Sequence, residues 1–251
     1  MFPVRLSIVT YNLWNTMRWP LRQPAVRQFV DLFRPDVLCV QELRPETRAC
    51  LDDAMSQHTR VHDQLPGWAC ESNIYWHRGL FAESEHGAED IGSLEEHRRL
   101  FWVRLKIAEQ NRTIFVSTAH FTSQRQATET DLGQSPRIEQ SRRTIAALQR
   151  LVRDNEPAWF MGDLNDAVHP TRMLHEAGYS SCFAALGIQC PPTFPCYPTA
   201  NVSAGARVIN HTIDWLVANQ HARAVAAQVP QCYHGDVAPS DHWPVLAVYE
   251  I

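Results

Sequence analysis

The sequence predicts a layered α/β domain. Two segments have the apolar spacing of an amphipathic helix, 24–33 and 136–152. Each is followed directly by a run typical of a buried strand, at 34–42 and 157–166. A helix followed directly by a buried strand, at two places along the chain, indicates layers of helix packed on sheet.

Three further runs are strand-like and lack a helical period. They lie at 73–81, 98–107 and 112–121, and short polar turns separate them. We expect them to form an antiparallel meander beside the α/β units, so the sheet system is of mixed direction. Strands are also expected at 5–14, at 211–219 and at the end of the chain.

Other segments connect these elements. A short helix is expected within 169–179, and the Pro-rich stretch 190–210 is expected to be a surface loop, because proline excludes a central strand or helix interior. No linker or internal repeat separates the chain, so we expect residues 1–251 to form a single domain.

Composition limits the possible partners. A formal net charge of −4 provides no global attraction to a polyanion, so a phosphate-bearing partner has to be held locally. No signal peptide or membrane-spanning run is apparent, and we expect a cytoplasmic monomer without stable membrane insertion. The seven cysteines are odd in number and scattered, which favours reduced thiols over a disulfide framework.

Polar side chains that are costly to bury lie at or near the ends of predicted strands. They are Asn12, Glu42, His120, Asp163, Asn165, Asp214, Asp241 and His242. Several have ordinary explanations when taken singly. Asn12 could cap a turn, His120 could be a satisfied core histidine, and the Gly-Asp-Leu-Asn-Asp run could be a simple turn. Together they indicate a site, because α/β folds collect ligand groups at strand ends.

The residue types in this set suit phosphoryl transfer. Glu42 and Asp241 are hard oxygen donors for Mg²⁺ or Mn²⁺, with the amide of Asn12 in support. Asp214 could fix the tautomer of His242 and stabilise its protonated form. These are the positioning and charge-stabilising groups that transfer of a phosphoryl group requires.

The ordered motifs resemble the endonuclease/exonuclease/phosphatase superfamily, the DNase I-like proteins. They are TYNLW, QE, TAHF, GDLND, TIDWL and SDHWPV, and they cover nearly the whole chain. The resemblance implies a four-layer α-β-β-α sandwich of two mixed sheets with helices outside. His120 in TAHF is similar to the DNase I, sphingomyelinase and tyrosyl-DNA phosphodiesterase branches rather than to abasic-site endonucleases.

The resemblance also implies a role for each motif residue. Glu42 would be the main metal ligand, with Asn12 and Asp241 completing or supporting the site. Asp163 would orient or deprotonate the attacking water, and Asn165 and His120 would contact the phosphate. His242, oriented by Asp214, would stabilise the transition state.

Some positions are peripheral to the motifs. Arg98 and Arg99 stand where relatives often have a phosphate-contacting arginine, although solvated strand ends have the same pattern. Glu71 could support His120, and Thr212 stands where many members have an arginine. The segments 122–137 and 190–210 are expected to be cleft loops, with Phe194 and Tyr197 available for stacking or for loop packing.

The first reading of function is a metal-dependent phosphodiesterase acting by in-line attack of water on a nucleic acid or nucleotide. The alternative is a phosphodiesterase or phosphatase acting on a phospholipid, sphingomyelin or phosphoinositide. A catalytically inactive binding module is a third reading, which the full set of polar groups disfavours.

Overall fold

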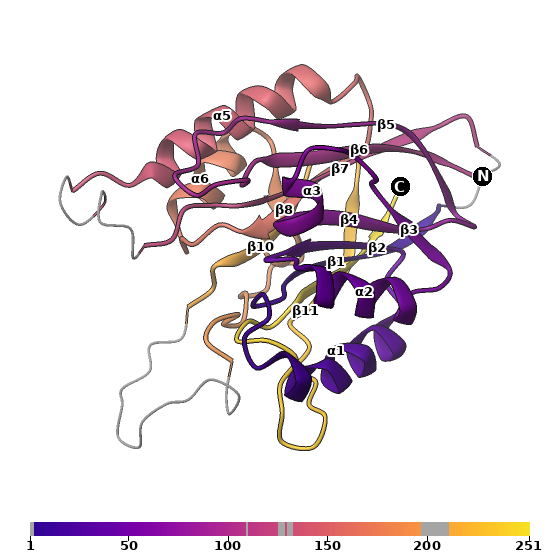
Figure 1. Cartoon of the computed structure of the whole chain (residues 1–251). Helices are drawn as coiled ribbons and strands as arrows, with labels where there is room; N and C mark the ends of the chain where they lie inside the picture. Colours follow the sequence, from indigo (N-terminus) through magenta and orange to yellow (C-terminus); the bar gives the residue numbers. More distant parts are fainter. Residues whose placement is uncertain (1–2, 109, 125–128, 130–132, 197–210) are drawn as a thin grey trace.

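Two six-stranded sheets pack face to face, with helices on the outer face of each (Figure 1). The computed structural model describes residues 3–108, 110–124, 129, 133–196 and 211–251. In the first sheet the strand order is β11-β12-β1-β2-β4-β3, and in the second it is β5-β6-β7-β8-β10-β9. Both sheets contain parallel and antiparallel pairs, so the predicted mixed four-layer sandwich is confirmed.

The strands of the first sheet are β1 (Arg5–Asn12), β2 (Val37–Gln41), β3 (His58–Arg60), β4 (Ser72–His77), β11 (Arg223–Gln228) and β12 (Val245–Glu250). Those of the second are β5 (Phe81–Glu89), β6 (Leu100–Ile107), β7 (Thr113–His120), β8 (Ala158–Asp163), β9 (Ser180–Ser181) and β10 (Asp214–Ala218). The helices are α1 (Trp19–Phe33), α2 (Pro45–Ala54), α3 (Gly67–Cys70), α5 (Pro136–Leu151), α6 (His169–Glu176) and α7 (Cys182–Ala185).

Alternation along β1 shows how the layers form. Leu6 and Ile8 point into the core between the two sheets, whereas Val9 and Tyr11 pack against α1. Tyr11 meets Phe29 of α1 edge to face, with ring centroids 5.1 Å apart. Because successive side chains of a strand face opposite ways, a strand covered on both faces is apolar throughout. Carboxylates in such strands are then favoured at the strand ends, where other polar groups can reach them.

The strand directions bring those ends together. β1 and β2 are parallel and finish side by side, with Asn12 opposite Gln41. β7 and β8 are also parallel and finish with His120 opposite Asp163. β10 runs antiparallel to β8 and begins with Asp214 opposite Asp163. The polar groups therefore meet at one edge of the sandwich.

The predicted meander is wrong in one strand. The run 73–81 contributes β4 to the first sheet and turns at residues 78–80 before β5 starts the second. The antiparallel meander is β5-β6-β7. Each of the two sheets is covered on both faces, so apolar pattern alone does not say to which sheet a buried strand belongs.

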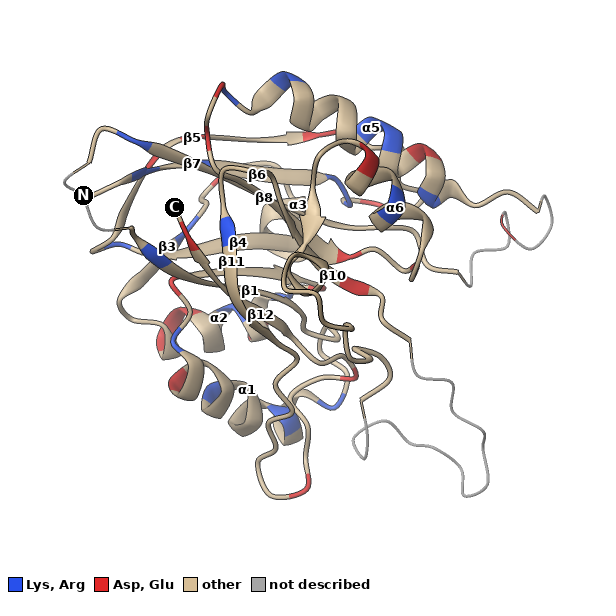
Figure 2. Ribbon diagram, turned by 180° about the vertical axis from the view of Figure 1, so that it is seen from behind, with Lys and Arg blue, Asp and Glu red and all other residues tan. Residues whose placement is uncertain are grey.

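Charged residues do not form a surface of one sign on the helices. Acidic and basic positions are interspersed along α1 and α5 (Figure 2). All seven cysteines lie in the described part of the chain, and none of them is paired in a disulfide there. Within those same residues, no helix is both long enough and apolar enough to cross a membrane.

Candidate active site

A cavity of about 460 Å³ opens at the edge where the strands end. Its lining contains Glu42, Arg98, His120, Asp163, Asn165, Asp241 and His242 from the predicted set, together with Trp14, Asn15, Ser123, Gln124, Phe194, His211 and Ile213. Asn12 and Asp214 are buried beneath it, each 1% exposed. Of the predicted site residues, Arg99 alone is neither in this lining nor bonded to it in the described structure.

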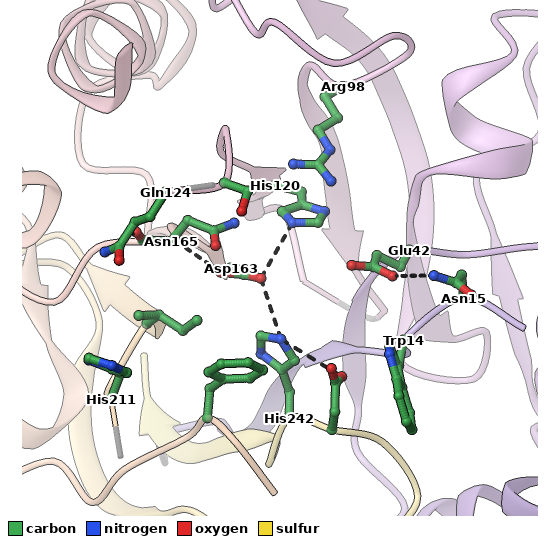
Figure 3. Close-up of a pocket in the computed structure, with 14 residues that line it drawn as sticks. Trp14, Asn15, Glu42, Arg98, His120, Gln124, Asp163, Asn165, His211 and His242 are labelled. Carbon is green, nitrogen blue, oxygen red and sulfur yellow. Dashed lines mark hydrogen bonds and ion pairs between the residues drawn. The ribbon is translucent and has the colours of Figure 1, made fainter. Parts of the chain in front are cut away.

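Asp163 lies at the centre of the cavity (Figure 3). Its Oδ2 accepts a hydrogen bond from Asn12 Nδ2 at 2.9 Å. The Nε2 atoms of His120 and His242 approach the same oxygen, at 3.4 and 3.8 Å. Gly162 allows this arrangement, since a Cβ there would lie 1.9 Å from the carbonyl oxygen of Ala119. The carboxylate is thus held between two imidazoles.

Each imidazole is oriented from behind by a buried carboxylate. His120 Nδ1 lies 2.9 Å from Glu71 Oε1, which confirms the contact expected for Glu71. His242 Nδ1 lies 2.9 Å from Asp214 Oδ2. Such a partner fixes the orientation and the tautomer of the ring. Both rings therefore present Nε2 to the cavity.

The charge on His242 follows from its surroundings. Burial alone would lower its pKa, but the carboxylates of Asp214, Asp163 and Asp241 outweigh burial and raise the pKa well above the ordinary value. Burial raises the pKa of Asp214, opposed by the His242 imidazole. Asp214 Oδ1 has no hydrogen-bond partner among the described residues. We conclude that the proton of this pair resides on His242, because the imidazolium faces three carboxylates.

Glu42 follows β2 in a left-handed conformation, with φ 55°. Such a conformation is uncommon for a residue with a side chain and is typical of constrained functional positions. Asn15 Nδ2 donates to Glu42 Oε2 at 2.9 Å, and Asn12 Nδ2 lies 3.4 Å from Oε1. Burial would raise the pKa of Glu42, but His120, His242 and the Asn15 hydrogen bond lower it overall. Glu42 therefore stays anionic.

Asp241 brings a second carboxylate to the same cavity. Burial, with a further contribution from Glu42, raises its pKa to about 6. Ser240 Oγ lies 3.4 Å from its Oδ1. Among the described residues, neither Glu42 nor Asp241 forms an ion pair with lysine or arginine. Two carboxylates in one cavity that lack a lysine or arginine partner are suited to holding a cation.

The orientation of Asn12 differs from that of a simple metal ligand. Its Oδ1 accepts a hydrogen bond from the backbone N–H of Trp14 at 2.9 Å, and its Nδ2 faces Asp163 and Glu42. Reversing the amide would set oxygen against two carboxylates, so the surrounding groups fix the assignment. Asn12 joins the Glu42 carboxylate to the central carboxylate of Asp163.

The trio of Asp163, Asp214 and His242 is compact enough to hold an ion, with ligand atoms within 4.8 Å of one another. Its chemistry argues against that use. His242 donates from Nδ1 to Asp214, and its raised pKa keeps the ring protonated, so it offers no lone pair. Glu42 and Asp241 remain the better cation donors.

Sequence reasoning missed Arg22. This arginine is fully buried and donates to the backbone carbonyls of Leu13, Trp14, Asn15, Met17 and Pro239. It thereby ties the turn after β1 to the loop that carries Asp241. A buried arginine on an amphipathic helix gives no signal in a single sequence, because most helical arginines are solvated.

The two predicted arginines differ in place. Arg98 lines the cavity, but Glu71 Oε1 lies 3.3 Å from its Nε and Glu95 Oε1 lies 3.5 Å from Nη1. Nη1 also donates to the carbonyl of Phe121 at 2.9 Å. Arg98 therefore orients the Glu71–His120 pair as well as facing the cavity. Arg99 lines a second hollow, with Asp90 and His97, to which Arg98 also contributes.

Residues on the remaining rim are held by backbone contacts. Asn165 Nδ2 donates to Phe121 O at 3.0 Å, and Gln124 Nε2 donates to Asn165 O at 2.9 Å. Thr212, in the place of the usual arginine, donates to Pro191 O, while its neighbour His211 lines the cavity. Tyr197 and much of the two expected cleft loops, 125–128, 130–132 and 197–210, lie outside the described residues.

Comparison with solved structures supports the same fold. TDP2 from D. rerio, in a complex with single strand DNA product, is 17% identical with a TM-score of 0.79, covering 98% of this chain and 99% of that one. A mannosyl-6-phosphatase from Bacteroides thetaiotaomicron VPI-5482 is 17% identical with a TM-score of 0.78, covering 97% and 99%. No curated protein matches the chain.

The model of the Endonuclease/Exonuclease/phosphatase family matches residues 9–242. This stretch contains every motif residue of the cavity, from Asn12 to His242. By that match the chain belongs to the endonuclease/exonuclease/phosphatase family.

Proposed function

We propose that this protein is a divalent-metal-dependent phosphodiesterase that hydrolyses a nucleic acid or nucleotide by in-line attack of water. The observation that carries the proposal is the position of Asp163, whose Oδ2 is approached by two carboxylate-backed imidazoles at 3.4 and 3.8 Å. A base flanked by two imidazole N–H donors can take a proton from water while the donors stabilise charge on phosphorus.

The donor set beside this centre fits Mg²⁺ or Mn²⁺. Glu42 and Asp241 are hard oxygen donors, and no cysteine is in the described lining of the cavity. Asn15 and Asn12 would hold Glu42 in place, since both donate to it. When bound there, the ion would polarise a phosphoryl oxygen as a Lewis acid.

The protein groups have separable tasks. Asp163 orients the attacking water and accepts its proton, because its contacts to the imidazoles are long enough to be exchanged for a water. His242 is charged before the reaction begins, so it donates to the phosphoryl oxygens without reorganisation. His120 donates from the opposite side, and Asn165 contributes an amide donor at the rim.

Nucleic acid or nucleotide is preferred as substrate for two reasons. Arg98 offers a local positive group in a protein of net negative charge. A structural neighbour, TDP2 from D. rerio, was solved with single strand DNA product. With so few basic groups in the cavity, we expect modest binding that weakens as salt rises.

A substrate panel with metal controls tests the proposal. We would measure turnover of single- and double-stranded DNA, RNA, nucleotide diesters, sphingomyelin, a phosphoinositide and mannose 6-phosphate with Mg²⁺, with Mn²⁺ and with chelator. We expect metal-dependent cleavage of nucleic acid or nucleotide diesters. Efficient cleavage of a lipid substrate with all nucleic acids and nucleotides left intact would replace the proposal by the lipid alternative.

A further inference from the structure

We infer that the cavity contains two aromatic subsites, Trp14 and Phe194, one on each side of the Asp163–His242 centre. The substrate is accordingly a phosphodiester with a planar aromatic group on each ester oxygen, as in two successive nucleosides. This inference rests on the proposed function and specifies what flanks the phosphate.

Trp14 is held rigidly although its ring is only half-buried. Its backbone has φ 54°, its N–H donates to Asn12 Oδ1, and its carbonyl accepts from Arg22. The guanidinium of Arg22 lies 5.0 Å from the ring centroid, a cation–π contact. The indole is thus fixed by a buried arginine and still lines the cavity.

Phe194 is fixed in the same way at the other end. Its N–H donates to His211 O at 2.9 Å and its carbonyl accepts from His211 N at 2.6 Å. The flanking backbone pairs with the loop around His242, through Cys196 N–H to Asp241 O and Trp243 N–H to Thr193 O, both at 2.7 Å. The ring lies 4.7 Å from the imidazole of His242 and remains half-buried.

The two rings belong to opposite ends of the site. Trp14 lies on the side of Glu42 and Asn15, whereas His211, the backbone partner of Phe194, lies on the far side of Asp163 and His242 (Figure 3). A phosphate bound at His242 would therefore have the Trp14 ring on one side and the Phe194 ring on the other. A terminal monoester would leave one of them empty.

Planar groups suit these surfaces better than acyl chains do. Stacking uses the face of a rigid ring and tolerates any base, because every base has a π-face. Hydrolysis forms a P–O bond from water, breaks the bond to one ester oxygen and returns a proton to that oxygen. One aromatic group thus leaves as the alcohol, and the other stays on the monoester.

Three esters with the same leaving group isolate the subsites. They are bis(p-nitrophenyl) phosphate, methyl p-nitrophenyl phosphate and p-nitrophenyl phosphate, each assayed with Mn²⁺ on the full chain. The variants are Trp14→Ala, Trp14→Phe and Phe194→Leu. Met17→Ala is the control, since Met17 is exposed on the same turn and does not line the cavity. Melting temperatures verify that each variant is folded.

We expect Trp14→Ala and Phe194→Leu each to lower kcat/KM for the bis ester about tenfold, the loss typical of one stacked base. In the variant that alters the subsite for the retained group, kcat/KM for the bis ester should fall relative to kcat/KM for the methyl ester. In the variant that alters the subsite for the leaving group, kcat/KM should fall for all three esters together. Trp14→Phe should recover most of the loss, and Met17→Ala should match the natural chain. Comparing ratios between variants cancels the intrinsic reactivity of the esters.

An unchanged bis-to-methyl ratio in both variants would overturn the two subsites while leaving the hydrolase intact. The two subsites would also be overturned if the unsubstituted protein preferred the monoester, or if it cleaved an aliphatic phospholipid diester as readily as thymidylyl-thymidine. If no phosphate ester is turned over with any metal, the proposed function itself fails and the subsites fail with it.

Discussion

Asn12 and Asp163 are 151 residues apart, yet Asn12 Nδ2 donates to Asp163 Oδ2 at 2.9 Å and joins the ends of the two sheets. The same amide nitrogen reaches Glu42 at 3.4 Å. One side chain therefore sets the spacing between the proposed metal ligand and the proposed base. Two buried carboxylates would repel each other without this neutral donor.

Replacing Asn12 by Asp should be more damaging than its small change in shape suggests. The variant would place a third carboxyl group against Asp163 and Glu42, which raises the energy of the ionised site. We expect a large loss of kcat and a lowered melting temperature. Asn15→Asp is the matched comparison, since Asn15 donates to Glu42 alone among the carboxylates. Equal effects of the two substitutions would show that the bridge to Asp163 is unimportant.

Chelator should abolish activity, and Mg²⁺ or Mn²⁺ should restore it. Glu42→Gln should shift the metal titration to higher concentration with little change in melting temperature, because a ligand charge is lost while the shape is kept. Glu46→Gln, on the exposed first turn of α2, controls for a general effect of removing an acid. Full turnover in excess chelator would contradict the metal assignment, and an unchanged titration would exclude Glu42.

Arg22→Lys should weaken metal binding although Arg22 does not line the cavity. Lysine carries one compact ammonium and cannot reproduce a fork that reaches five carbonyls on two loops. We expect a lower melting temperature and weaker metal binding, with kcat at saturating metal largely kept. Arg27→Lys, on an exposed face of α1, is the control. A fall in kcat with unchanged metal affinity would mean that Arg22 acts in some other way.

The motif residues could be predicted from sequence because burial of an acid or amide is costly wherever it occurs. Asp163 and Asp214 follow or begin apolar strands, and that contrast is visible in a single sequence. The α/β layering could be predicted because apolar periodicity reports which faces are covered. Neither signal depends on contacts between distant segments.

The supporting residues could not be predicted for the opposite reason. Trp14, Asn15 and Arg22 act through a left-handed turn and through backbone carbonyls, and backbone acceptors carry no sequence signature. The sheet to which β4 belongs could not be predicted either, because it depends on a turn at residues 78–80 and not on the apolar pattern. α2 was missed because only Thr47, Cys50 and Leu51 are buried, which makes its apolar face short.

The Asp214–His242 pair gives the sharpest test of catalysis. If His242 stabilises the transition state, His242→Ala should lower kcat while KM stays nearly unchanged. Loss of one such donor costs roughly 10²-fold to 10³-fold in rate. Asp214→Asn should act through the same residue, because an amide can hold the wrong tautomer and cannot stabilise the imidazolium.

The double variant should be scarcely slower than the slower single one, since the two side chains act as a unit through a single 2.9 Å contact. A purely structural cap on β12 predicts something different, namely a lower melting temperature with turnover per folded molecule preserved. Measuring melting temperature and kcat on the same preparations separates the two roles. A destabilised His242→Ala protein that keeps full activity would refute the catalytic one, and additive losses in the double variant would refute the coupling.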